Sequence, residues 1–208
     1  MPIKAILFDM DGVLIDARDW HYLALNEALA PFGFEISRGD HLARFNGLST
    51  SVKLKILSEE SGFPYGLHEI VNDVKQDRTL RLAGQLCFPN IGHQILLSRI
   101  KSKGIKIGVV TNSIRNSAEI LLSHAQIVQF LDVLVTNQDV KCPKPDSEGY
   151  LLACQKLGVA PQEVIVVEDG EYGMEAARKA GCIVLQVDSS DDVCLELFSE
   201  SLPVLFEE

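Results

Sequence analysis

The chain has 208 residues, of which 47% are hydrophobic, and a formal net charge of −10 at pH 7. This length allows one large domain or a core with a smaller insert, and the apolar fraction is typical of a globular protein with a buried core. The acidic balance argues against nucleic acid and anionic membranes as partners and is compatible with a metal cation.

The first predicted element is a strand over residues 4–9. Its apolar run stops at Asp9, and Asp11 and Gly12 follow within three positions. A short apolar run bounded by Gly and acidic residues is typical of a buried strand. In open α/β sheets, ligands bind at the carboxyl ends of the strands. We therefore expect an acidic site where this strand ends.

Residues 17–83 contain only helical patterns. Ser49 is expected to N-cap one of these helices, because Ser is a preferred residue at that position. A second feature is the recurrence of Lys75, Arg78 and Arg81 every three residues. Such a stripe is usually a solvated face, and the alternative is contact with an anionic substrate. The predicted helices span residues 17–32, about 40–46, 50–61 and 67–83.

From residue 84 onward, helices alternate with strands, which indicates a parallel sheet covered on both faces. The predicted fold class is α/β, a doubly wound parallel sheet formed by residues 1–16 and 84–208. Residues 17–83 form an inserted all-helical cap that leaves the sheet beside Asp9 and Asp11. The predicted strands are 106–111, 131–135, 163–168 and 182–187, and the predicted helices are 91–103, 115–125, 147–157, 172–180 and about 191–199.

The cysteines and the N-terminus indicate a reducing compartment. The five cysteines are odd in number and form no CxxC pair, so we expect reduced, largely buried thiols. Lys4 and Asp9 interrupt any signal-peptide core, and no apolar stretch approaches the length of a membrane span. We expect a cytoplasmic protein that does not contact a membrane.

Polar residues follow four predicted strands, and in a parallel sheet these ends meet at one edge. Asp9, Asp11, Glu168 and Asp169 would place several carboxylates together, which is unfavourable unless a cation is present. Mg²⁺ is the expected cofactor, because it prefers a few carboxylates together with a phosphate. The Thr111 hydroxyl and the first N–H groups of the helix at 115–125 would form an anion cradle, and Lys144 would add positive charge. This set of groups is suited to phosphoryl transfer.

Four segments carry a family resemblance: FDMDGVL at 8–14, VVTNS at 109–113, KPDSEGY at 144–150 and VVEDGEYGMEAARKAG at 166–181. In these motifs and their order the chain resembles haloacid dehalogenase superfamily hydrolases with a helical cap, the subgroup of β-phosphoglucomutase and phosphoglycolate phosphatase-like proteins. In the third motif Ser147 replaces a proline and Lys141 is an additional lysine. Lys144 is preferred because its spacing to Tyr150 matches the family pattern.

The resemblance implies roles for the four acidic residues. Asp9 would be the nucleophile that forms an aspartyl-phosphate. Asp11 would protonate the leaving oxygen and then deprotonate the attacking water. Asp9, the backbone carbonyl of Asp11, and Asp169 would hold Mg²⁺, with Glu168 contributing directly or through water.

The resemblance also implies substrate contacts. Thr111 and Asn112 would bind the phosphoryl group, and Lys144 would neutralise its charge. Trp20-His21 resembles an aromatic-histidine pair of the β-phosphoglucomutase relatives, so His21 is a candidate substrate ligand. A structural role for this histidine is the alternative.

The expected function is that of a Mg²⁺-dependent phosphatase acting on a small phosphorylated metabolite, such as a sugar or polyol phosphate, as a monomer or homodimer. One alternative is a sugar phosphomutase, although Thr50 stands where the mutase cap commonly places an arginine. Another is a non-enzymatic phosphoacceptor or binding protein, against which Asp11 argues. A calcium loop, a receiver domain and a dehalogenase fit these motifs less well.

Overall fold

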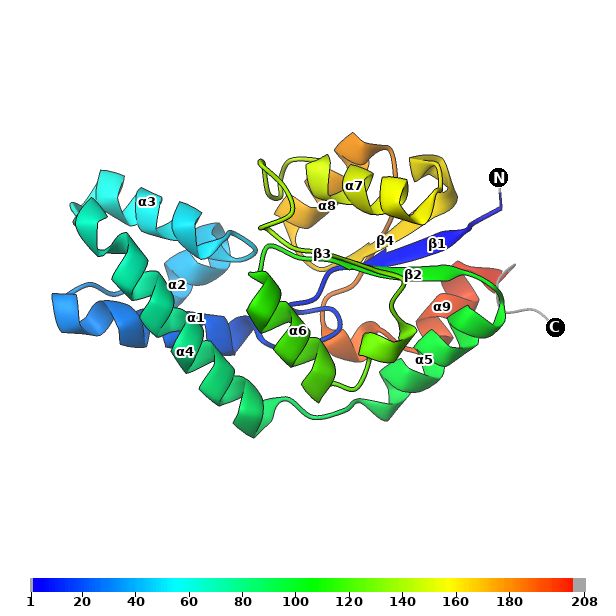
Figure 1. The fold of residues 1–208 in the computed structure, drawn as a ribbon, viewed down its shortest axis with the longest axis horizontal. Helices are drawn as coiled ribbons and strands as arrows, with labels where there is room; N and C mark the ends of the chain where they lie inside the picture. The colour runs from blue at the N-terminus through cyan, green and yellow to red at the C-terminus, as the bar shows by residue number, and fades with distance from the viewer. Residues whose placement is uncertain (1, 204–208) are drawn as a thin grey trace.

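Strand β1 (Ala5–Phe8) lies at the centre of a five-stranded parallel sheet with the order β3-β2-β1-β4-β5 (Figure 1). The computed structural model describes residues 2–203. All four side chains of β1 are buried, as expected for a strand covered on both faces. The other strands are β2 (Lys106–Val110), β3 (Val133–Val135), β4 (Val164–Glu168) and β5 (Ile183–Gln186).

Helices cover both faces of the sheet, which confirms the predicted doubly wound α/β fold (Figure 1). Alternation along β1 sends Ile6 and Phe8 into one apolar cluster and Ala5 and Leu7 into the other. The first cluster is completed by α5 (Ile91–Ser102), α6 (Arg115–His124) and α9 (Leu195–Ser201). The second is completed by α7 (Glu148–Leu157) and α8 (Glu171–Ala180).

Between β1 and α5 the chain forms a separate helical unit, which we call the cap (residues 18–86; Figure 1). It has an apolar cluster of its own, centred on Leu29, Leu54 and Phe63. The last cap helix crosses the boundary predicted at residue 83. None of the helices within residues 2–203 has the length and apolar character needed to span a bilayer. The cap helices are α1 (Arg18–Leu29), α2 (Arg38–Asp40), α3 (Thr50–Ser61) and α4 (His68–Leu86), with a π-helical turn at His41–Phe45.

One local prediction is wrong, and a second is confirmed in position but not in its hydrogen bond. The last helix begins at Leu195 rather than near residue 191, because the Asp192 carboxylate accepts backbone N–H bonds from Asp188 and Ser189 and holds a separate turn there. Ser49 stands at the N-cap of α3, but its side chain makes no capping hydrogen bond. It is buried and lines a cavity between the cap and the sheet.

The strand order places a crevice beside β1. The chain proceeds from β1 outward through β2 to β3, then crosses back to β4 and β5. Such a reversal leaves an opening at the carboxyl ends of the central strands, where α/β proteins bind ligands. The cap leaves the sheet at this same edge.

Gly108 in β2 has no room for a side chain. A Cβ there would lie 2.6 Å from Leu7 Cδ2 and still closer to Val133 Cγ1. We predict that Gly108→Ala lowers the free energy of unfolding by about 1–3 kcal/mol, because the packed sheet must expand. Gly84→Ala is the control, since nothing lies within 4 Å of a Cβ at that position of α4. It should raise stability by about 0.5–1 kcal/mol. Urea unfolding measures both changes, and equal effects would contradict the packing described for β2.

Candidate active site

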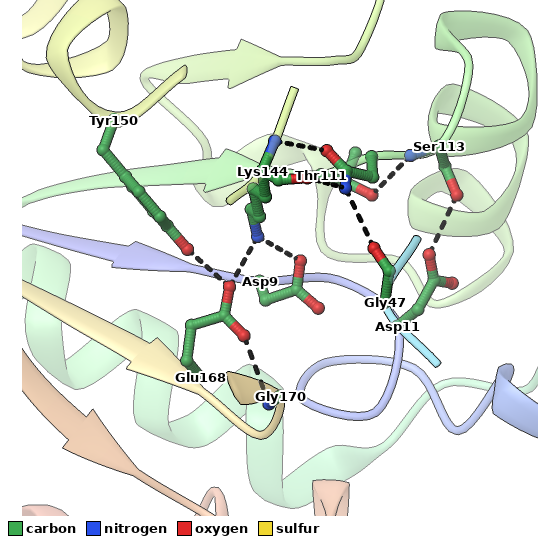
Figure 2. Close-up of polar contacts among 10 residues, drawn as sticks. Asp9, Asp11, Gly47, Thr111, Ser113, Lys144, Tyr150, Glu168 and Gly170 are labelled. Atoms are coloured by element: carbon green, nitrogen blue, oxygen red, sulfur yellow. Dashed lines mark hydrogen bonds and ion pairs between the residues drawn. The ribbon is translucent and has the colours of Figure 1, made fainter. Parts of the chain in front are cut away.

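The polar residues predicted from the strand ends lie together at one edge of the sheet (Figure 2). Asp9 follows β1 directly, and its N–H donates to the carbonyl of Val167 in β4. Thr111 follows β2, and Glu168 is the last residue of β4. Lys144 comes from the loop between β3 and α7. The parallel sheet therefore brings together groups that are far apart in the sequence.

Lys144 joins two buried carboxylates. Its Nζ lies 2.6 Å from Asp9 Oδ1 and 2.6 Å from Glu168 Oε1 (Figure 2). Burial would lower the pKa of this ammonium, but the charges and hydrogen bonds of Asp9 and Glu168 outweigh burial and raise it. Lys144 therefore stays charged. A buried ion pair of this kind costs desolvation, and removing one partner leaves an uncompensated charge.

Tyr150 completes the surroundings of Glu168. Its hydroxyl donates to Glu168 Oε1 at 2.6 Å, and the Lys144 Nζ lies 5.0 Å from its ring centroid. Burial first, and then the negative charges of Glu168 and Asp9, raise the pKa of Tyr150, so the phenol stays a neutral donor. The sequence motif placed Tyr150 only as a spacing marker, and the structure shows it holding a predicted metal ligand.

Asp9, Glu168 and Asp169 form a cluster of oxygen donors, with one ligand atom of each within 4.8 Å of the others. Burial raises the pKa of Asp9 well above its usual value, and the neighbouring carboxylates raise it further while Lys144 opposes them. Burial and Glu168 also raise the pKa of Asp169 to about 6, although Arg18 opposes this with Nη1 at 3.4 Å. A hard divalent cation fits this donor set, because it would relieve the repulsion.

The Asp11 carboxylate lies outside this cluster. Ser113 Oγ donates to its Oδ2 at 2.9 Å, and His21 Nε2 lies 2.9 Å from its Oδ1 (Figure 2 shows the Ser113 bond). Lys75 Nζ lies 3.0 Å from His21 Nδ1. Because an ammonium can only donate, Nδ1 is the acceptor and the ring proton lies on Nε2, which donates to Asp11. His21 therefore forms a hydrogen bond with Asp11 and also lines the cavity.

These bonds set the ionisation of Asp11 and His21. Burial alone would raise the pKa of Asp11, yet the donors His21 and Ser113 and the charge of Lys75 hold it below its usual value. Burial, followed by the charge of Lys75, lowers the pKa of His21, so the imidazole stays neutral. Asp11 is expected to act first as an acid and then as a base. The observed hydrogen bonds stabilise its ionised form, which is the base.

Thr111 and Asn112 differ in whether their side chains still have a donor that could bind a phosphoryl group. Thr111 Oγ1 accepts from Ser113 N at 3.0 Å and keeps its own proton to donate. The Asn112 amide is engaged with backbone groups: it donates to Gly47 O at 2.9 Å and to Lys144 O, and it accepts from Lys144 N. Its side chain therefore orients the Lys144 loop and contacts the cap.

The anion cradle differs in part from its prediction. The N–H of Arg115, at the start of α6, already donates to the Gln138 side chain at 2.8 Å. The first turn of α6 therefore offers fewer free donors than expected. A phosphoryl group would rely more on Thr111 and Lys144.

A cavity of about 140 Å³ separates the cap from the sheet edge. Two buried lysines line its cap side, Lys53 from α3 and Lys75 from α4. The stripe on α4 is therefore split: Lys75 faces the cavity, whereas Arg78 and Arg81 are exposed and form ion pairs on the surface. The sequence pattern gave no sign of Lys53, because burial of a lysine depends on how the cap helices pack.

Comparisons with known proteins show which family this chain is similar to. A family model described as haloacid dehalogenase-like hydrolase matches residues 6–187. The chain is 32% identical over 179 residues to the phosphorylated carbohydrates phosphatase of Thermotoga maritima, covering 86% of this chain and 82% of that protein. It is 28% identical to the β-phosphoglucomutase of Bacillus subtilis, covering 95% of each. The crystal structure of a β-phosphoglucomutase from Clostridium difficile superposes with a TM-score of 0.84 at 25% identity, covering 99% of this chain and 100% of that one.

Lys144→Met should destabilise the protein by about 3–5 kcal/mol, because Asp9 and Glu168 would remain buried without their cation. Lys141→Met is the matched control, since this lysine lies in the same loop with an exposed side chain and should change stability by less than about 0.5 kcal/mol. Thermal unfolding without metal measures both. Added Mg²⁺ should recover part of the loss in Lys144→Met. Wild-type stability of Lys144→Met in the absence of metal would contradict the role given to this lysine.

Proposed function

This chain belongs to the haloacid dehalogenase-like hydrolases, and we propose that it is a Mg²⁺-dependent phosphatase that hydrolyses a small phosphorylated carbohydrate through an aspartyl-phosphate on Asp9. The matching family model spans most of the chain, and the Thermotoga relative is named for phosphatase activity on phosphorylated carbohydrates.

The observation that carries the proposal is the contrast between Asp9 and Asp11. Asp9 lies in the carboxylate cluster with Lys144 on one oxygen, which leaves its other oxygen to attack phosphorus. Asp11, two residues later, points instead to Ser113 and His21. Two carboxylates in different environments can divide the work of nucleophile and proton carrier.

Asp9, Asp169 and Glu168 are the side chains that would hold Mg²⁺. When bound, the ion would neutralise negative charge on the phosphoryl oxygens and on the carboxylates. Glu168 Oε1 accepts from both Lys144 and Tyr150, whereas Oε2 accepts a single long bond from Gly170 N at 3.5 Å (Figure 2), so Oε2 is the oxygen better able to turn toward a cation. The chemistry of these donors, all hard oxygens, suits Mg²⁺.

In the first half-reaction, the free oxygen of Asp9 bonds to phosphorus and the bond from phosphorus to the sugar oxygen breaks. Asp11 in its protonated form gives its proton to that leaving oxygen. The negative charge of the bound phosphate favours this protonated form, against the bonds from His21 and Ser113. Thr111 and Lys144 donate to the phosphoryl oxygens and hold them in line.

In the second half-reaction, Asp11 is ionised, the state that its hydrogen bonds favour. It takes a proton from water, the water oxygen bonds to phosphorus, and the Asp9–phosphorus bond breaks to release phosphate. The His21 and Lys75 contacts that support this base come from the cap. Closure of the cap therefore completes the site as well as excluding bulk water from the first step.

A phosphomutase uses the same first half-reaction, and the similarity to β-phosphoglucomutases keeps it as the second candidate. Thr50, in the cavity wall, stands where the mutase motif commonly has an arginine. The two candidates differ in product. A phosphatase releases free phosphate, whereas a mutase returns an isomeric sugar phosphate.

Asp9→Asn should lower phosphate release from sugar phosphates by roughly 10³-fold or more, because the amide cannot act as the nucleophile. Asp16→Asn, in the same segment but exposed, is the control and should keep wild-type activity. A colorimetric phosphate assay with Mg²⁺ measures release, and chromatography detects conversion of glucose 1-phosphate to the 6-phosphate. Isomerisation without free phosphate would establish the mutase instead. Full activity of Asp9→Asn would exclude both.

The Mg²⁺ requirement should depend on pH through Asp169. Its pKa is raised to about 6, so below this pH the carboxyl is protonated and must lose a proton before it can bind a cation. The half-saturating Mg²⁺ concentration should therefore fall by up to about tenfold per pH unit as the pH rises toward 6, and level off above 7. Titrating activity with Mg²⁺ at several pH values between about 5 and 8 tests this pH dependence. A requirement that does not change with pH would contradict the place of Asp169 among the ligands.

A further inference from the structure

Lys53 is a buried lysine whose role the proposed reaction does not explain. It lies in the first turn of α3, is 7% exposed, and lines the cavity opposite the catalytic carboxylates. Lysine is almost never buried unless it is paired, because taking an ammonium out of water is costly. A buried lysine in a cavity wall therefore needs a partner.

No partner is present among residues 2–203. Lys75 donates to His21 and Lys144 is held between two carboxylates, but the side-chain ammonium of Lys53 has neither a hydrogen bond nor an ion pair within the described chain. Burial lowers its pKa to about 8, and only the charge of Asp11 opposes this. Asp11 is already bonded to Ser113 and His21. The three donors of the Lys53 ammonium are thus left to the cavity.

His41 is a second residue of the same cavity wall with a buried polar atom that lacks a hydrogen-bond partner among the described residues. The residue is 3% exposed, lines the cavity, and its Nε2 is buried with no hydrogen-bond partner in the described part of the chain. Burial, followed by the charge of Lys53, lowers the pKa of His41 to about 4, so the ring is neutral and can donate one hydrogen bond. Ammonium and imidazole together present donors and net positive charge.

The charge of this wall favours an anion over a sugar hydroxyl. Lys53 lies near a second buried ammonium, Lys75, and their mutual repulsion contributes to the lowered pKa of Lys75. A hydroxyl could accept a hydrogen bond but would leave that repulsion in place. A carboxylate or a phosphate would accept hydrogen bonds from these donors and would also neutralise their positive charge.

We propose that Lys53, together with His41, forms a second anion subsite in the cap, so that the substrate is a phosphorylated carbohydrate with a second anionic group remote from the phosphate that is cleaved. This inference rests on the proposed function and narrows it. The second group is a carboxylate, as in a phosphorylated sugar acid, or another phosphate, as in a sugar bisphosphate.

The test measures binding rather than turnover. It uses the Asp9→Asn protein with Mg²⁺, so that esters bind without being cleaved. Three matched pairs of esters differ in the second anion: glycerol 3-phosphate and 3-phosphoglycerate, glucitol 6-phosphate and 6-phosphogluconate, and fructose 6-phosphate and fructose 1,6-bisphosphate. Calorimetry gives the dissociation constant of each. We expect the two-anion member of at least one pair to bind about tenfold tighter or more. The first two pairs report a carboxylate and the third a phosphate.

Lys53→Met in the same background should remove most of that preference. Lys55→Met is the matched control, because Lys55 lies two residues further along α3 with an exposed side chain, and the preference should remain. Equal binding of both members in every pair would overturn the proposal, and this result does not depend on whether the Lys53 variant folds. An equal loss for both members in Lys53→Met would also overturn it, since Lys53 would then bind the phosphate that is cleaved.

Failure of the proposed function gives a different result. Wild-type protein that releases no phosphate from any of the six esters would count against the phosphatase. A preference for two-anion esters in the Asp9→Asn protein would support the subsite in either case, because that binding is measured without cleavage.

Discussion

The site depends on burying several carboxylates at one edge of a sheet, and Lys144 is the group that makes this possible. Its ammonium lies 2.6 Å from both Asp9 and Glu168, which end neighbouring strands. Without it, two like charges would face each other in a region of low polarity. The lysine compensates only part of the negative charge, since Asp169 remains beside the pair. We propose that this incomplete compensation gives the site its affinity for a divalent cation, and that the cation together with Lys144 then attracts a phosphate.

The cap controls the other half of the chemistry. Asp11 leaves the sheet two residues after Asp9 but takes its hydrogen bonds from Ser113 on the core and from His21 on the cap, and Lys75 supports His21. The proposed proton carrier is therefore oriented by the core and the cap together. The cap also places Lys53 in the cavity wall, so the part of the molecule that we infer to select the substrate also supports the proposed base.

Much of the core could be predicted from the sequence. Apolar strands that end at Glu168 or just before Asp9 and Thr111 predict both a parallel sheet and a polar edge, because the apolar runs mark the strands and the polar residues mark their carboxyl ends. The cap was harder to predict from the sequence, because the exposure of its lysines depends on how the cap helices pack. The pattern on α4 gave no means to distinguish buried Lys75 from its exposed neighbours. The bonding of Asn112 to Gly47 was also unpredictable, because it joins two loops that meet only in the folded chain.

The central claim is that Asp9 carries the phosphoryl group between the two half-reactions. The most direct measurement is a rapid acid quench of wild-type protein during turnover, followed by borohydride reduction, which converts an aspartyl-phosphate to homoserine, and by peptide mass spectrometry. Homoserine at position 9 and at no other aspartate is the predicted result. Steady turnover with unmodified Asp9, or with the modification at Asp11, would contradict the account.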